Sequence, residues 1–262
     1  RGMPSAHRAV AALHSLGGWS GDSDRFGEAT AILAGDLCLQ WSDEVYSTSG
    51  LPAEHLARGR ATFDRMRTQL MGGQFLDMLE SVRSWAGLST EQRLAAARKI
   101  IRFKSAKYTI EQPLLVGARA AGVDAAAVPM LSAYGLALGE AFQLRDDLLG
   151  VFGDPAQTGK PAGDDLREGK RTVLTAYALD RADAAALALW DQLFGRADLD
   201  LDGVEALRRT ITATGAQERV EADITRLAAD AGAALAAAAA YLDRQAGAVL
   251  AELIVLTTDR VT

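Results

Sequence analysis

Acidic and basic side chains are concentrated in one stretch, residues 142–170, which reads FQLRDDLLGVFGDPAQTGKPAGDDLREGK. Carboxylates and cations mixed in this way suit a site for a polyanion that arrives with a metal ion. The first half of the stretch carries a helical apolar pattern, so a helix would present part of the set. Its charged residues include Asp146, Asp147, Asp154, Lys160, Asp164, Asp165, Arg167 and Lys170.

Asp146 and Asp147 are the candidates for holding the metal. Mg²⁺ dehydrates reluctantly and is usually held by one or two carboxylates together with substrate phosphates. Two unit charges about 4 Å apart repel by about 4 kcal/mol at an effective dielectric of 20, so a diphosphate needs a bridging cation to approach these acids. Position 150 shares a helix face with Asp146. It is Gly150, so a third acid is missing there.

An Asp-Asp pair before Gly and Pro is also typical of a helix end with a solvated turn. The segments around the pair favour the metal site instead. The amide side chain of Gln143 lies one helical turn before Asp147, and Gly159-Lys160-Pro161 and residues 163–170 follow the pair.

Together these residues resemble the second aspartate-rich motif of the trans-isoprenyl diphosphate synthases, the polyprenyl synthetase family. In that family the segment reads roughly FQ..DD..D, then GK, then D..EGK..T. Gly150 stands where the family usually has a third Asp. A water or Asp154 would then supply the metal contact that this third Asp makes. The matching residues are Phe142, Gln143, Asp146, Asp147, Lys160, Asp165, Glu168, Gly169, Lys170 and Thr172.

Other segments resemble motifs of the same family in the right order, over nearly the whole chain. Residues 1–7 resemble RRGxPxxH, residues 34–37 the AGD helix and residues 73–77 the GQxxD helix. Residues 104–109 resemble KTAxYT, with Ser105 where Thr is common. Because RRGxPxxH directly follows the first DDxxD motif in the family, we expect the chain to lack that motif and the helices before it.

The resemblance implies an all-α, isoprenoid synthase-type helical bundle around a central cavity, as a single domain over residues 1–262 that is N-terminally incomplete. It implies isoprenoid biosynthesis by prenyl transfer, in which isopentenyl diphosphate condenses with an allylic diphosphate such as geranyl or farnesyl diphosphate. It also implies a homodimer and Mg²⁺ at Asp146 and Asp147. Lys104, Ser105, Gln143 and Lys160 would be catalytic, and Arg1, Lys104, Gln143, Lys160 and Lys170 would bind substrate.

Three alternatives stay open beside the synthase. A class I terpene cyclase would share the fold and the ionisation step but bind one substrate, and the Gly-Lys-Pro and Glu-Gly-Lys segments favour the synthase. A non-catalytic subunit of a heteromeric synthase is suggested by Gly150 and the missing N-terminal acids. A metal-carboxylate oxidase bundle needs Glu-x-x-His on its helices, and no histidine here has Glu three residues before it.

Several conspicuous residues also have structural interpretations. Gln74 and Asp77 share a helix face and could be a buried hydrogen-bonding pair or adjoin the substrate. We expect Lys107 to be solvated and Asp36 to cap or brace a helix. His7 and His14 lack a carboxylate at ligand spacing, so we expect packed or surface histidines.

Composition agrees with a helical enzyme. The chain has 262 residues, 49% of them hydrophobic, which is enough for one large core or two small ones. Only six prolines favour helices over sheet. A net charge of −6 argues against nucleic acid as a partner. Cys38 is the only cysteine, which excludes an internal disulfide and favours a small core residue in a cytoplasmic protein. Residues 231–242 are too few to span a membrane, which takes about 20 apolar residues.

Apolar periodicity and turn residues divide the chain into helices with no repeat or linker. We expect a polar loop over residues 150–170, a kink or interruption at Pro113, and a capped start at Ser89. The expected helices cover residues 7–16, 22–46, 52–85, a segment from 89, 104–121, 124–149, 172–179, 183–194, 202–214, 216–240 and a segment from 243 on.

Overall fold

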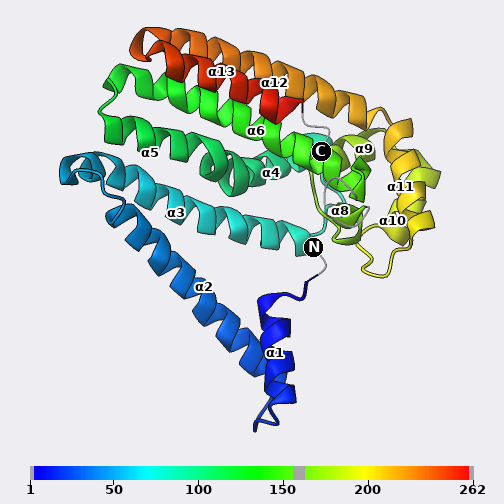
Figure 1. Ribbon diagram of the computed structural model, residues 1–262. Coiled ribbons are helices and arrows are strands. Elements are labelled where there is room, and N and C mark those ends of the chain that lie inside the picture. Colours follow the sequence, from blue (N-terminus) through cyan, green and yellow to red (C-terminus); the bar gives the residue numbers. More distant parts are fainter. Residues whose placement is uncertain (1–2, 156–162, 260–262) are drawn as a thin grey trace. The chain divides into compact units, whose positions relative to one another are not determined.

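The computed structural model describes residues 3–155 and 163–259, and within these ranges the chain forms helices and turns with no strand. Figure 1 shows the arrangement of the helices. Contacts divide the chain into two compact units, Arg1–Leu56 and Ala57–Thr262. Each unit is described by itself below, and the single domain over the whole chain stays a prediction.

The first unit contains α1 (Ala6–Leu16) and α2 (Ser23–Ser47), which pack against each other. The Asp22 carboxylate caps α2 by accepting a hydrogen bond of 2.8 Å from the Arg25 N–H. His14 is buried, with ring centroids 5.8 Å from Trp19 and 5.1 Å from Phe26. The prediction of a packed histidine is therefore confirmed for His14.

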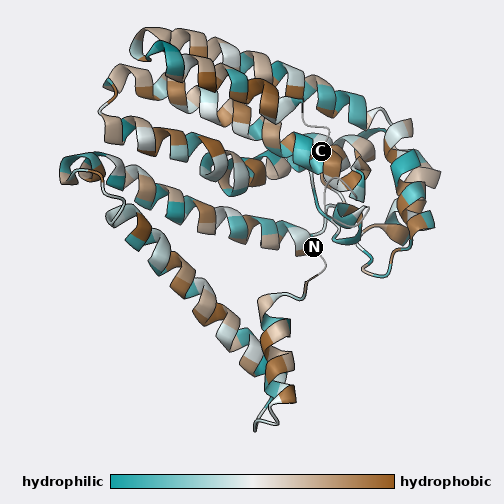
Figure 2. Cartoon of the chain, viewed as in Figure 1, coloured by the Kyte–Doolittle hydropathy of each residue, from teal (hydrophilic) through white to brown (hydrophobic). Residues whose placement is uncertain are grey.

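Two predictions for α2 are wrong. Cys38 is exposed rather than part of a core. Gly27, near the start of α2, is the one residue of this helix that is buried. Asp36 lies in the middle of α2 with an exposed side chain, so it is not a cap. Figure 2 shows hydrophobic residues along α2, and Ile32, Leu33 and Val45 are among those that are exposed.

The second unit holds the candidate site of residues 142–170. Its helical elements, with α3 counted here, follow each other along the chain. They are α3 (Ala53–Val82), α4 (Thr90–Ile100), η1 (Ile101–Glu111), α5 (Gln112–Ala121), η2 (Ala125–Ala127), α6 (Val128–Phe152), α8 (Asp164–Arg167), α9 (Val173–Arg181), α10 (Ala184–Leu193), α11 (Leu201–Ala213), α12 (Ala216–Ala238), η3 (Ala239–Tyr241) and α13 (Arg244–Thr258).

Helix α6 is the centre of this unit and packs against η1, α12, α13, α5 and α8. Leu131, Tyr134, Leu138 and Leu144 on α6 are fully buried. By length and composition alone, the segment Ala125–Phe152 could cross a membrane, and among the described residues it is the single such candidate. Its packing and the acidic pair inside it instead mark the core helix of a bundle.

Helices α4, η1 and α5 run on from one another between Thr90 and Ala121, and η1 has π-helical geometry. The predicted cap at Ser89 is confirmed, since Ser89 and Gln92 form a reciprocal capping box. The chain passes from π to α geometry at Gln112, one residue before Pro113. The predicted interruption therefore lies where a proline is tolerated, in the first turn of a helix.

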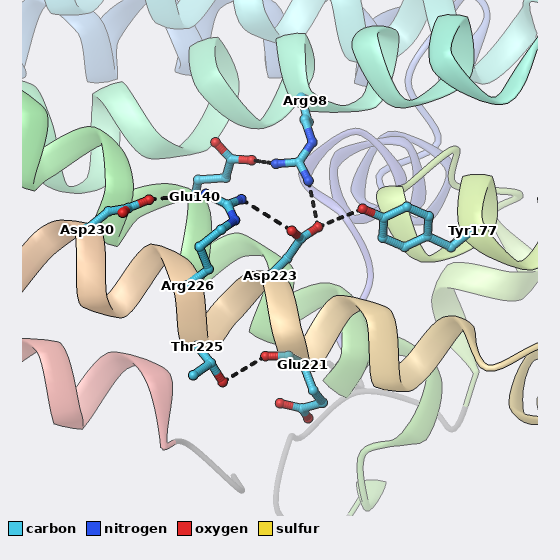
Figure 3. Close-up of polar contacts among 8 residues, drawn as sticks. All are labelled: Arg98, Glu140, Tyr177, Glu221, Asp223, Thr225, Arg226 and Asp230. Atoms are coloured by element: carbon cyan, nitrogen blue, oxygen red, sulfur yellow. Dashed lines mark hydrogen bonds and ion pairs between the residues drawn. The ribbon is translucent and has the colours of Figure 1, made fainter.

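A network of polar side chains ties four helices of this unit together (Figure 3). Arg98 of α4 donates to Glu140 of α6 and, over 2.6 Å, to Asp223 of α12. The Tyr177 hydroxyl of α9 donates to Asp223 over 2.8 Å. Because Glu140 lies one turn before Gln143 on α6, this network fixes the helix that carries the acidic pair.

Candidate active site

The last three turns of α6 present Gln143, Asp146 and Asp147. The Gln143 Nε2 donates a hydrogen bond of 2.8 Å to Asp147 Oδ1, one helical turn away. Asp147 is buried, whereas Asp146 is partly exposed. The helix therefore orients one carboxylate through an amide and leaves the neighbouring one accessible.

Burial raises the pKa of Asp147 to about 8. The nearby negative charges of Asp165 and Asp146 act in the same direction. The hydrogen bond from Gln143 and the positive charge of Lys170 oppose the rise without cancelling it. Crowded buried carboxylates of this kind are stabilised by a cation, because a positive charge favours their ionised form.

Lys104 and Ser105 come from η1, which α3 approaches closely. A Cβ atom on Gly73 would lie 2.5 Å from the backbone nitrogen of Lys104, so this contact requires a glycine. One turn further along α3, Asp77 accepts a hydrogen bond of 2.5 Å from Lys104 Nζ. This pairing holds the Lys104 ammonium beside the cavity described below.

The segment after α8 supplies further cations. Lys170 Nζ lies 2.5 Å from Asp165 Oδ1 and 3.2 Å from Glu168 Oε2. Burial of Lys170 disfavours its charged form, but the two carboxylates outweigh burial and raise the pKa of Lys170 above its ordinary value. Lys170 is therefore a fixed positive charge at neutral pH.

These elements enclose a cavity of about 430 Å³ within the second unit. Its wall combines cations, carboxylates and a buried hydroxyl with apolar residues from α3, α4 and η1. The lining residues are Asp77, Met78, Glu80, Ser81, Ala97, Ile100, Ile101, Lys104, Ser105, Gln143, Asp146, Asp147, Glu168, Lys170, Arg171 and Thr172.

Of the predicted site residues, the structure brings Lys104, Ser105, Gln143, Asp146, Asp147 and Lys170 to this one cavity. Arg1 and Lys160 lie outside the described residues. The individual catalytic, substrate-binding and metal-binding roles stay predictions, although the shared cavity agrees with them.

Two of the structural interpretations were wrong. Lys107 is not solvated, because its ammonium pairs over 2.7 Å with the buried carboxylate of Glu111. Gln74 and Asp77 do not form a buried pair, because Gln74 is exposed and Asp77 bonds to Lys104. The interpretation of Asp77 as a residue beside the substrate site is the one that fits the cavity.

Sequence reasoning did not select Arg171 as a site residue. Arg171 lines the cavity, donates a hydrogen bond of 2.8 Å to the Glu80 carbonyl oxygen and lies 5.6 Å from the centre of the Trp85 ring. The signal in the sequence that could have identified Arg171 was its position directly after Lys170. Asp165 was also left out of the site, although it pairs with Lys170.

The chemistry of the donor set fits Mg²⁺ together with a diphosphate. Asp146 and Asp147 offer hard oxygen ligands, and Mg²⁺ typically takes one or two carboxylates and completes its shell with water and phosphate oxygens. Among the described residues, no three His, Cys, Asp or Glu side chains form a group that could hold a metal by themselves. The phosphate oxygens of a substrate would therefore complete the coordination.

Comparison with known proteins agrees with this arrangement. Residues 1–211 match the profile of the family described as polyprenyl synthetase. A geranylfarnesyl diphosphate synthase of Aeropyrum pernix is 36% identical over 160 residues, which are 60% of this chain and 48% of that protein. A (2E,6E)-farnesyl diphosphate synthase of Mycobacterium tuberculosis is 32% identical over 167 residues, 63% of this chain and 44% of that protein. The chain spans about half the length of these sequence relatives.

The structural comparison gives the same fold. The crystal structure of a geranylgeranyl pyrophosphate synthase from Corynebacterium glutamicum, complexed with isoprenyl diphosphate and magnesium, superposes with a TM-score of 0.86. The two chains are 44% identical, and the match covers 99% of this chain and 71% of that one. The prediction of an all-α isoprenoid synthase fold is confirmed.

Proposed function

Because the chain belongs to the polyprenyl synthetase family, we propose that the protein is a trans-prenyltransferase that condenses isopentenyl diphosphate with an allylic diphosphate such as geranyl or farnesyl diphosphate. One observation carries the proposal. A single cavity of about 430 Å³ contains two adjacent carboxylates of α6 together with Lys104, Lys170 and Arg171. This combination of acids and cations is what a metal-bound diphosphate requires.

The basic residues would bind the diphosphate of the allylic substrate. Lys104 and Lys170 offer ammonium groups held by Asp77 and Asp165, and Arg171 offers a guanidinium group. Pre-positioned charges stabilise developing negative charge without the cost of reorienting at the moment of reaction. In this proposal, these residues stabilise the negative charge that develops on the diphosphate as its bond to carbon breaks.

Asp146 and Asp147 would hold Mg²⁺, with Gln143 orienting Asp147 through the hydrogen bond described above. When bound, Mg²⁺ would neutralise the diphosphate and stabilise it as a leaving group. The Gln143 carbonyl and the buried Ser105 hydroxyl line the same cavity and would stabilise the allylic cation by their dipoles.

The reaction needs no side-chain nucleophile. The carbon–oxygen bond of the allylic substrate breaks and its electron pair leaves with the diphosphate. The double bond of isopentenyl diphosphate then attacks the allylic carbon, and the product loses a proton, for which the departed diphosphate is the base. We also propose that the protein forms a homodimer and is located in the cytoplasm.

The test is to incubate the protein with Mg²⁺, isopentenyl diphosphate and geranyl or farnesyl diphosphate, and to identify products by chromatography and mass spectrometry. We expect an acid-labile prenyl diphosphate longer than the primer by one or more five-carbon units. A cyclic hydrocarbon formed without isopentenyl diphosphate would instead identify a terpene cyclase. No product from any allylic primer would refute the proposal and favour the non-catalytic subunit.

A further inference from the structure

Trp85 lies in the connection between α3 and α4, and its side chain is buried, at 3% exposure. The indole Nε1 donates a hydrogen bond of 3.1 Å to Glu80 Oε2. The Trp85 backbone oxygen accepts hydrogen bonds from the Leu88 N–H over 3.2 Å and from Arg93 Nη2 over 3.3 Å. The backbone and the ring are therefore both fixed, because buried polar groups that lose their partners are costly.

The guanidinium group of Arg171 lies over the Trp85 ring. Its Cζ is 5.6 Å from the ring centroid, which is within the range of a cation–π contact. Arg171 Nε also donates a hydrogen bond of 2.8 Å to the backbone oxygen of Glu80. Glu80 therefore contacts both partners, since its carboxylate holds the indole and its carbonyl holds the guanidinium group.

Arg171 is held by neutral groups. Glu80 directs its carboxylate to Trp85 Nε1 and to Arg83 Nη1, 3.3 Å away, and offers Arg171 only its backbone oxygen. The two lysines of the cavity wall differ, because each has a carboxylate partner at 2.5 Å. Burial lowers the pKa of Arg171 and the Glu80 charge opposes this, but a guanidinium group stays protonated in proteins. Arg171 thus keeps its charge for a ligand.

The terminal nitrogens of Arg171 are left for that ligand. In the part of the chain that the structure describes, neither Nη1 nor Nη2 has a hydrogen-bond or ion-pair partner, and the side chain lines the cavity. A guanidinium group presents its N–H groups as a planar fork that can bind two oxygens of one phosphate. The direction of this fork depends on the ring and the carbonyl that hold it.

We propose that Trp85, oriented by Glu80, is a positioning residue that holds the Arg171 fork toward the diphosphate in the cavity. The inference rests on the proposed function, in which Arg171 is one of the cations that bind the diphosphate. It adds a residue that contacts no substrate and acts through Arg171. Trp85 lies outside every segment that resembles a motif of the family, so its role follows from the packing alone.

The test measures binding of inorganic pyrophosphate by calorimetry at a saturating Mg²⁺ concentration. Trp85→Leu removes the aromatic face, and Trp85→Phe keeps an aromatic face but removes the donor to Glu80. Trp190→Leu is the matched control. Trp190 is buried in the same hydrophobic core as Trp85 and stacks on Phe194, but it does not line the cavity.

We expect Trp85→Leu to weaken pyrophosphate binding by about tenfold, which corresponds to ~1.4 kcal/mol. Trp85→Phe should weaken it by about threefold, because part of the cation–π contact remains. Trp190→Leu should also lower the melting temperature, since it too opens a cavity in the core, but should leave pyrophosphate binding unchanged. Equal losses of binding in Trp85→Leu and Trp190→Leu would overturn the assignment of Trp85.

Combination with Arg171→Ala separates positioning from support of the fold. Once the guanidinium group is gone, Trp85 has no fork to hold, so Trp85→Leu should weaken binding by no more than about twofold in that background, a coupling that a double-mutant cycle isolates. A tryptophan that only supports the fold would weaken binding by the same factor with and without Arg171. If Trp85→Leu fails to fold, the same cycle with Trp85→Phe decides the question.

Unchanged pyrophosphate binding in folded Trp85→Leu, or equal losses in the two backgrounds of the cycle, would overturn the positioning role while leaving prenyl transfer intact. A wild-type protein that binds no pyrophosphate with Mg²⁺ would overturn the proposed function, and this inference with it.

Discussion

At the scale of single residues, one part of the site was predictable from the local sequence and another part was not. The types and spacing of Gln143, Asp146 and Asp147 were enough to predict a metal site on one helix. The pairing of Lys104 with Asp77 was not predictable, because these residues lie 27 positions apart and meet only when α3 packs on η1. The burial of Lys107 against Glu111 escaped prediction for a similar reason, since it depends on the packing of η1 in the bundle.

Replacing Asp146 or Lys104 by alanine should lower turnover by about 10²-fold or more, because each removes a charge that acts on the leaving diphosphate. Initial rates with saturating primer and Mg²⁺ measure the effect. Asp191→Ala and Lys99→Ala are the controls, since both side chains are exposed and neither lines the cavity. Unchanged rates in both site variants, with the controls also active, would remove these assignments.

The protonation of Asp147 predicts how the stability of the metal-free protein depends on pH. Its pKa is raised by burial to about 8 in the folded protein, above the ordinary value of 3.8. The folded state then holds a proton that the unfolded state has lost, so the contribution to stability is complete below about pH 4 and is lost as pH rises through 8. Melting temperature in chelator should therefore fall as pH rises from about 4 to about 8 and level off above pH 8.

Asp147→Asn should flatten this pH dependence, because the asparagine carries no titrating proton. Melting curves of Asp146→Asn provide the comparison, since that carboxylate is partly exposed. The same slope in Asp147→Asn as in the wild type would show that another group controls the transition.

At the scale of elements, the order and approximate ends of the helices followed from periodicity, caps and turns. The Ser89 capping box and the start of α2 at Ser23 are examples in which local hydrogen bonds decide the boundary. The π geometry of η1 was not predicted, because no residue type in Ile101–Glu111 signals it. Segments of π-helix are often found at functional sites, and η1 contributes Lys104 and Ser105.

The network of Arg98, Glu140, Tyr177 and Asp223 should stabilise the helices that carry the site. Asp223→Ala leaves Arg98 with one carboxylate and the Tyr177 hydroxyl without its acceptor. We expect a loss of about 2 kcal/mol in the free energy of unfolding, because these groups are largely buried. Tyr177→Phe should cost about 1 kcal/mol.

Urea unfolding measures both variants, and Asp198→Ala is the control, since Asp198 forms an exposed ion pair with Arg196, which is not part of the network. Equal stability of Asp223→Ala and the control would show that the network contributes no more than a surface pair.

At the scale of the whole molecule, the fold class was predictable because alanine-rich amphipathic segments and few prolines leave helices as the main option. The acidic net charge of −6 was also informative, because a protein of this charge needs localised cations and metal to bind an anion. The division into Arg1–Leu56 and Ala57–Thr262 was not foreseen, since no linker composition marks it.

Ligand binding should stabilise the folded protein as a whole. A ligand at 100 times its dissociation constant stabilises the folded state by about 2.7 kcal/mol, which for a domain of this size raises the melting temperature by about 5–10 °C. We expect this rise with Mg²⁺ and pyrophosphate together and a much smaller one with either alone. Equal shifts with and without Mg²⁺ would contradict a metal-bridged site.

The most direct test of prenyl transfer is to count both products of one reaction. With labelled farnesyl diphosphate, isopentenyl diphosphate and Mg²⁺, the released pyrophosphate and the isopentenyl units joined to carbon are measured together. Prenyl transfer predicts one pyrophosphate released for each unit added, with neither formed in the absence of Mg²⁺. Pyrophosphate released without incorporation of isopentenyl units would contradict it.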